Sequence, residues 1–294
     1  MSSFFTYVFN GVSLGSVYAI IALGYTMVYG IAKMLNFAHG DVIMVGGYVL
    51  FSMIYGTGLN PFVALLIAMV ACTVLGVVIE KVAYRPLREA SSLAVLITAI
   101  GVSILLQNLA QLIFSANPKM FNNPINLGTI SMFGNRVTIE GSTILMIVTG
   151  IVIVVGLSVF IKNTKTGRAM LAVSEDKDAA RLMGINVNTI ISITFAIGSA
   201  LAAIASILMF NAYPSLVPTS GSMPGIKAFV AAVFGGIGSI PGAMVGGIIL
   251  GIIEVLSGAY ISTKLANAIV FVILIVVLIF KPTGLFGKKI KEKV

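Results

Sequence analysis

The sequence predicts an all-α protein, a polytopic bundle of about eight or nine transmembrane helices, some broken or re-entrant. Of its 294 residues, 59% are apolar and only 9% are charged, whereas soluble domains carry about 25% charged residues. A soluble fold of this size could not bury so much apolar surface. Uncharged runs reach the roughly 20 residues that a span needs at 1–32, 42–79, 90–118, 141–161, 182–226 and 228–253.

Glycine, proline and asparagine divide the longest of these runs into separate helices. The run 42–79 is divided at Tyr55–Pro61, where Pro61 suits the first turn of a new helix. The segment 211–225 is too rich in Pro and Ser to be a span. The stretch 226–259 fits either two short crossings or one re-entrant hairpin. We expect helices at about 5–31, 40–55, 61–80, 92–115, 142–161, 189–210, 226–238, 242–259 and 264–280.

The net charge of +9 indicates topology rather than nucleic-acid binding. Lys and Arg gather in three segments, 80–90, 162–188 and 281–294, and basic loops stay on the cytoplasmic side of a membrane. The segments 116–141 and 211–225 are poor in Lys and Arg and should face outside. An N-terminus outside and a C-terminus in the cytoplasm follow.

The polar segment Asn36–Asp41 holds the single histidine and lies between two apolar runs. A metal site needs three or four His, Cys or carboxylate ligands, and the chain has one His and one Cys. No nucleophile motif accompanies His39 and Asp41, so we expect no catalytic site either. We favour a helix break at Asn36, His39 and Gly40, followed by Asp41 capping the next helix. Because irregular backbone at membrane depth needs protein or water around it, this break should lie beside the translocation path or its cytoplasmic gate.

A second interruption, within 235–247, contains Gly238, Pro241 and Gly242. Interrupted helices in two halves of a transporter point to a translocation site, although glycines spaced at four also favour close helix packing. Glu254 is a carboxylate within an apolar run. Such a residue marks either the pathway or an interhelical hydrogen bond, and the sequence leaves both open.

The basic loop 162–188 contains an ordered charge pattern. Acidic Glu175, Asp176 and Asp178 come first, Arg181 comes late, and Gly184 follows. This order predicts one short amphipathic helix over about 175–183 that ends at a glycine cap. Ala179, Leu182 and Met183 would share one face, which suits docking on a partner; a solvated loop is the alternative.

The stretch "DAARLMG" matches the core of the coupling motif of ABC importer permeases: an acidic residue, two alanines, three residues and a glycine. The Ile-x-Leu-Pro continuation that usually follows is absent after Gly184. The whole chain instead resembles the branched-chain amino acid permease family of LivH type. Four stretches carry the likeness: "LGYTMVYGIAKMLNFAHGD", "TGRAMLAVSEDKDAARLMGINV", "IKAFVAAVFGGIGSIPGAMVGG" and "KPTGLFG".

The resemblance implies a single permease domain over 1–294 in a bacterial inner membrane, without cofactor or catalytic residues. Its partners would be a second related permease, two cytoplasmic ATPase subunits and an extracytoplasmic solute-binding protein that delivers leucine, isoleucine or valine. A same-fold permease for urea, amides or other amino acids remains open, as does a stand-alone secondary transporter. The residues expected to couple to the ATPase are Gly167, Arg168, Glu175, Asp176, Asp178, Ala179, Ala180, Arg181 and Gly184.

The charge asymmetry predicts which loops an external reagent reaches. A cysteine placed at Asn123 should react with an impermeant thiol reagent in intact cells, whereas one at Lys165 should not. The opposite labelling pattern would reverse the orientation.

Overall fold

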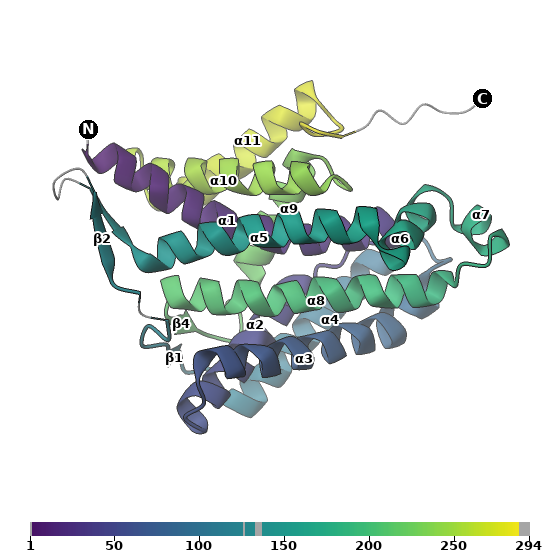
Figure 1. The fold of residues 1–294 in the computed structure, drawn as a ribbon, viewed down its shortest axis with the longest axis horizontal. Helices are drawn as coiled ribbons and strands as arrows, with labels where there is room; N and C mark the ends of the chain where they lie inside the picture. The colour runs from purple at the N-terminus through teal and green to yellow at the C-terminus, as the bar shows by residue number, and fades with distance from the viewer. Residues whose placement is uncertain (1, 126, 133–136, 288–294) are drawn as a thin grey trace. The chain divides into compact units, whose positions relative to one another are not determined.

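The computed structural model describes residues 2–125, 127–132 and 137–287, and it confirms the all-α class (Figure 1). In this part of the chain, six helices are long and apolar enough to cross a membrane: α1, α3, α4, α5, α8 and α10. The basic residues Lys288, Lys289, Lys291 and Lys293 lie outside the described residues. The helices are α1 Ser2–Ala32, α2 His39–Phe51, α3 Pro61–Ile79, α4 Ser92–Phe114, α5 Gly141–Asn163, α6 Lys165–Glu175, α7 Lys177–Leu182, α8 Val187–Ala212, α9 Ser222–Gly235, α10 Ile240–Tyr260 and α11 Ala266–Phe280.

Two small antiparallel strand pairs occur where the sequence predicts only loops. β1, Lys119–Met120, pairs with β4, Ser215–Leu216. β2, Thr129–Met132, pairs with β3, Val137–Glu140. Each pair forms backbone hydrogen bonds within segments that connect helices. Strands this short leave no alternating pattern in the sequence that would predict them.

The described chain divides into two compact units, and unit 1 comprises 1–26, 127–154 and 227–294. Within it, α1 and α10 touch backbone to backbone. A Cβ on Gly251 would lie 2.2 Å from the Gly15 nitrogen, and a Cβ on Gly15 would lie 2.6 Å from the Ile248 Cα. The glycines of α10 therefore allow the close helix packing that their spacing predicts.

The stretch 226–259 forms a tight helical hairpin. α9 begins at Ser222, four residues earlier than predicted, and its 14 residues reach only about 21 Å, less than a bilayer core of roughly 30 Å. α10 is long enough to cross. The segment after α11 closes the end of α9, because the N–H groups of Leu285 and Phe286 donate to the carbonyls of Phe234 and Gly235, both at 2.9 Å.

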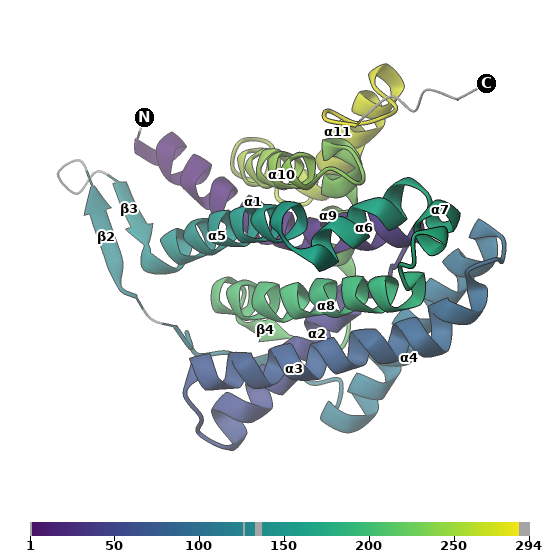
Figure 2. The same ribbon diagram turned by 45° about the vertical axis from the view of Figure 1, so that its right-hand side comes forward.

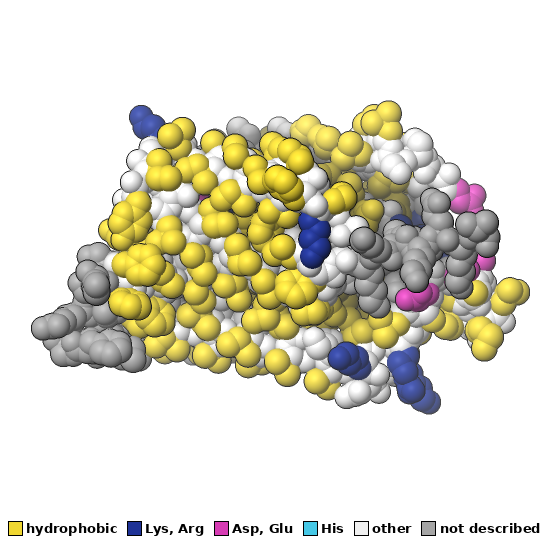
Figure 3. Space-filling model, turned by 90° about the horizontal axis from the view of Figure 1, so that it is seen from above, with side chains coloured by type: hydrophobic (Ala, Val, Ile, Leu, Met, Phe, Trp, Pro, Cys, Tyr) yellow, Lys and Arg dark blue, Asp and Glu magenta, His cyan; other side chains and the backbone are white. Residues whose placement is uncertain are grey.

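Unit 2 comprises 27–126 and 155–226. In it α3 and α8 lie side by side, and α2 packs against both (Figures 1 and 2). Cys72 of α3 is buried and its thiol lies against α2, since it contacts the Val42 carbonyl at 3.6 Å. On the face of the described chain that Figure 3 shows, hydrophobic side chains gather over a broad area, as expected of a surface that lies against lipid.

The α1–α10 contact predicts opposite effects for two glycine substitutions. Gly251→Ala would press a methyl group into the α1 backbone and lower the free energy of unfolding by about 1–3 kcal/mol. Gly101→Ala on α4 meets no atom within 4 Å and should be neutral or stabilising, because alanine favours a helix by about 1 kcal/mol over glycine. Thermal unfolding of the purified protein in detergent measures both, and equal midpoints would contradict the packing.

Candidate functional site

The chain breaks its helix between α1 and α2, and we call residues 33–38 the helix break. α1 ends at Ala32, and Lys33 follows in the left-handed region with φ +59°. The sequence correctly predicts a break here, but only Asn36 of the expected residues lies in it. His39 and Gly40 are instead the first residues of α2. The His39 N–H donates to the Asn36 carbonyl at 3.1 Å, and the hydrogen bonding of the helix begins with this bond.

Asp41 lies in the first turn of α2 and does not cap it, contrary to the sequence prediction. Its carboxylate is only 1% exposed and accepts a hydrogen bond of 3.0 Å from the amide of Gln107 on α4. The same amide reaches the Ser222 hydroxyl, at the start of α9, at 3.1 Å. Gln107 thus joins α2, α4 and α9. Sequence reasoning missed it, although an amide inside an apolar span is a signal of buried polar contact.

The start of α2 also touches the turn before α9 directly. A Cβ on Gly40 would lie 2.4 Å from the Gly221 carbonyl oxygen, and a Cβ on Gly221 would lie 2.1 Å from that of Gly40. Within the described ranges, no three His, Cys, Asp or Glu side chains come together in a way that would hold a metal ion.

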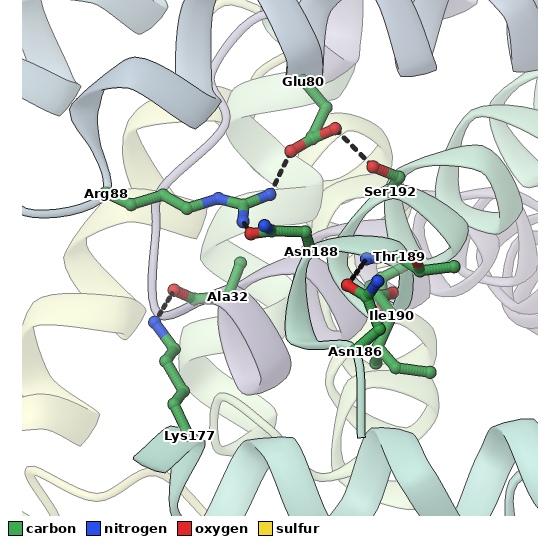
Figure 4. Close-up of polar contacts among 10 residues, drawn as sticks. Ala32, Glu80, Arg88, Lys177, Asn186, Asn188, Thr189, Ile190 and Ser192 are labelled. Atoms are coloured by element: carbon green, nitrogen blue, oxygen red, sulfur yellow. Dashed lines mark hydrogen bonds and ion pairs between the residues drawn. The ribbon is translucent and has the colours of Figure 1, made fainter. Parts of the chain in front are cut away.

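A buried polar cluster, which we call the Glu80 network, lies beside the break (Figure 4). Glu80 is 0% exposed, pairs with the Arg88 guanidinium and accepts a 2.6 Å hydrogen bond from the Ser192 hydroxyl. Arg88 also donates to the Asn188 side chain. The sequence treats 80–90 as a charged loop, whereas the structure extends α3 through a π-helical turn, Glu80–Tyr84. The network fixes this extension to α8.

Two side chains hold the break itself. The Tyr84 hydroxyl, at the end of the π-helical turn, donates to the Asn36 side-chain oxygen at 2.9 Å. The Lys177 ammonium donates to the Ala32 carbonyl at 2.8 Å, as Figure 4 shows. These contacts join residues 48 and 145 positions apart in the sequence. Neither was expected from the sequence.

The loop 162–188 contains two helices, so the prediction of one helix over 175–183 is wrong. Asp176 has an extended φ of −153°, which ends α6 at Glu175 and begins α7. Its carboxylate accepts the N–H groups of Asp178 at 2.8 Å and Ala179 at 3.0 Å. These bonds, with Ala179 first, hold the pKa of Asp176 below its usual value. Gly184 has the expected left-handed backbone, with φ +82°.

Ala179, Leu182 and Met183, which the sequence predicts to share one face of the helix, are all exposed. Ala180, which is also among the predicted coupling residues, is 3% exposed and packs within the protein. Leu182 and Met183 are 89% and 82% exposed and form an apolar tip. Arg181 pairs with Asp178 at 3.0 Å, an exposed pair worth roughly 0–1 kcal/mol.

The remaining predicted coupling residues belong to the same loop, 162–188. Gly167 lets α6 fold back on α5, because a Cβ there would lie 2.4 Å from the Ile161 Cα. Arg168, Glu175 and Ala179 are exposed.

Glu254 belongs to unit 1, where it joins three helices. Its carboxylate pairs with Lys227 of α9 at 2.6 Å and accepts the Tyr18 hydroxyl of α1 at 3.0 Å. The Lys227 ammonium lies 5.8 Å from the centre of the Tyr18 ring. Lys227 was not among the predicted residues, although its charge interrupts the apolar run and indicates a buried partner.

The other predicted residues of unit 1 form the turn into α10. Gly238 has φ +93°, and Pro241 lies in the first turn of the helix. The Gly242 N–H donates to the Ser239 hydroxyl, the N-cap, at 3.2 Å. Gly238, Pro241 and Gly242 therefore make a capped helix start.

The model of the family described as "Branched-chain amino acid transport system / permease component" matches residues 7–278. The high-affinity branched-chain amino acid transport system permease protein LivH of Escherichia coli is 46% identical, over 99% of this chain and 98% of its own length. The permease protein BraD of Pseudomonas aeruginosa is 44% identical, over 97% and 96%. A solved structure of PsaBC from Streptococcus pneumoniae in complex with Fab shares the fold, with TM-score 0.51, 15% identity and coverage of 93% of this chain and 91% of that one.

The Lys227–Glu254 pair predicts that the stability of the protein depends on keeping both of these charges or neither. Lys227→Met would leave a buried carboxylate without its cation, a change that costs about 3–5 kcal/mol of stability. Adding Glu254→Gln should recover most of this loss, because no uncompensated charge remains. Thermal unfolding of the single and double variants measures the coupling. Additive losses in the double variant would show that the pair is not an energetic unit.

Proposed function

Because the chain belongs to the family of branched-chain amino acid transport system permease components, we propose that it is the membrane-spanning subunit of a bacterial ABC importer for leucine, isoleucine and valine. The observation that carries this proposal is the similarity to LivH and BraD over nearly the full length of both chains. Six helices suited to crossing a membrane agree with a protein of the inner membrane.

The printed sequence contains no G-x-x-x-x-G-K-[ST] phosphate loop, so ATP hydrolysis belongs to other polypeptides. We assign it to two ATPase subunits on the cytoplasmic face. A second related permease would complete the membrane domain, and an extracytoplasmic binding protein would deliver the solute. The basic loop 162–188 and the C-terminus would face the cytoplasm and the N-terminus the outside, because basic loops stay inside.

The helix α7 would make the main contact with an ATPase subunit. Its six residues span only about 9 Å, and both of its ends are well defined, by the Asp176 cap and the left-handed Gly184. The exposed tip of Leu182 and Met183 supplies apolar surface for a cleft on the partner. A short helix with well-defined ends moves as one body when the partner moves.

The translocation path would pass beside the helix break. Irregular backbone at membrane depth and the buried carboxylate of Asp41 are both costly and mark functional sites in transporters. Asn36, His39 and Gly40 would shape this part of the path. We also propose that the path involves Glu254, Gly238, Pro241 and Gly242. Transport by variants at these positions tests this role.

Transport by the reconstituted assembly tests the proposal. The chain would be purified with its partner permease and ATPases, placed in proteoliposomes and supplied with the binding protein. We expect ATP-dependent uptake of leucine, isoleucine and valine, and none without ATP. Uptake of urea but not of leucine would assign the chain to another solute, and uptake driven by an ion gradient without ATP would contradict an ABC importer.

Gly184 gives a matched test of the coupling role of α7. Gly184→Val places a branched side chain on a left-handed backbone, which distorts the end of α7 although no atom lies within 4 Å of the added Cβ. We expect uptake and solute-stimulated ATP hydrolysis to be lost together. Gly58→Val is the control, because Gly58 has φ +71° and equally open surroundings outside loop 162–188. Equal activity in both variants would show that α7 does not couple the subunits.

A further inference from the structure

The end of α1 leaves a backbone group that α1 cannot satisfy. The last carbonyls of any helix lack an intrahelical donor, and Ala32 is fully buried, out of reach of bulk water. The structure satisfies the Ala32 carbonyl with the Lys177 ammonium at 2.8 Å. A cation also suits the negative end of the helix dipole there.

Lys177 is the first residue of α7, directly after its cap Asp176. Burial lowers the pKa of Lys177, and the nearby cations Arg88, Lys33 and Arg181 lower it further, while Asp178 raises it. Its surroundings thus disfavour the charged ammonium, and a half-buried lysine is held among other cations. The bond to Ala32 is the feature that explains this placement.

The two contacts that hold the break have different supports. Tyr84, which holds Asn36, lies on the extension of α3 that the Glu80 network fixes to α8. Lys177 lies instead on α7, whose tip is exposed and which no comparable buried network fixes among the described contacts. A displacement of α7 would therefore pull on the end of α1 while Tyr84 keeps the other side of the break in place.

We propose that Lys177 is the positioning residue that transmits movement of α7 to the end of α1 and so to the helix break. The inference rests on the proposed function, in which an ATPase moves α7. The moved carbonyl belongs to the residue before Lys33, whose left-handed backbone marks the point where the chain changes direction. The start of α2, with Asp41, lies beyond that point.

Lys177→Met tests the link, because methionine retains much of the length and loses the donor. In the reconstituted importer we expect solute-stimulated ATP hydrolysis to persist while uptake per ATP falls about tenfold, within the usual 5–150-fold range of coupling between sites. Lys177→Arg, which keeps a cationic donor, should restore most of the uptake. Lys165→Met, an exposed lysine at the start of α6, is the matched control and should change neither quantity.

Three results would overturn the proposal. Unchanged uptake per ATP in Lys177→Met would show that the bond transmits nothing. Parallel loss of uptake and hydrolysis would show that Lys177 serves docking. If Lys177→Met does not assemble, Lys177→Gln, with a shorter donor, must show the reduced ratio, and an unchanged ratio there refutes the link. Absence of solute-stimulated hydrolysis in the unmodified importer would instead refute the proposed function.

Discussion

The constraint on which this structure depends is that backbone N–H and C=O groups shielded from water must find partners within the protein. A continuous helix meets it everywhere except at its ends, and this chain ends helices inside the protein. Side chains and loop backbone then supply the missing partners. Lys177 serves the end of α1, and Leu285 and Phe286 serve the end of α9. The broken helix therefore depends on residues far from it in the sequence.

Glycine allows the helices to pack together. In lipid the hydrophobic effect does not drive two apolar helices to associate. Close backbone approach provides dispersion contacts instead, and it occurs where α1 meets α10 and where Gly40 meets Gly221. The glycines at 101 and 156 meet no other group within 4 Å. Glycine content alone thus says little, and the neighbour of each glycine decides its role.

Composition and helix-breaking residues predicted the class, the order of the helices and most of their ends, because long apolar runs leave few alternatives. The quoted motifs also predicted the family. The division of the loop at Asp176 was missed even though an aspartate before two helical N–H donors is a local cap signal. The burial of Ala180, the Glu80 network and the Lys177 bond could not be predicted, because each depends on which distant segment packs alongside.

The glycine contact between α1 and α10 also determines when α1 can reach its native packing during synthesis of the chain. Gly15 leaves the ribosome roughly 240 residues before Gly251, which at about 5–20 residues per second means a wait on the order of 10–50 s. During that interval the glycine face of α1 has no native partner and must be occupied by lipid or by the insertion machinery. A nascent chain stalled before α10 would therefore keep this face of α1 without its native helix partner.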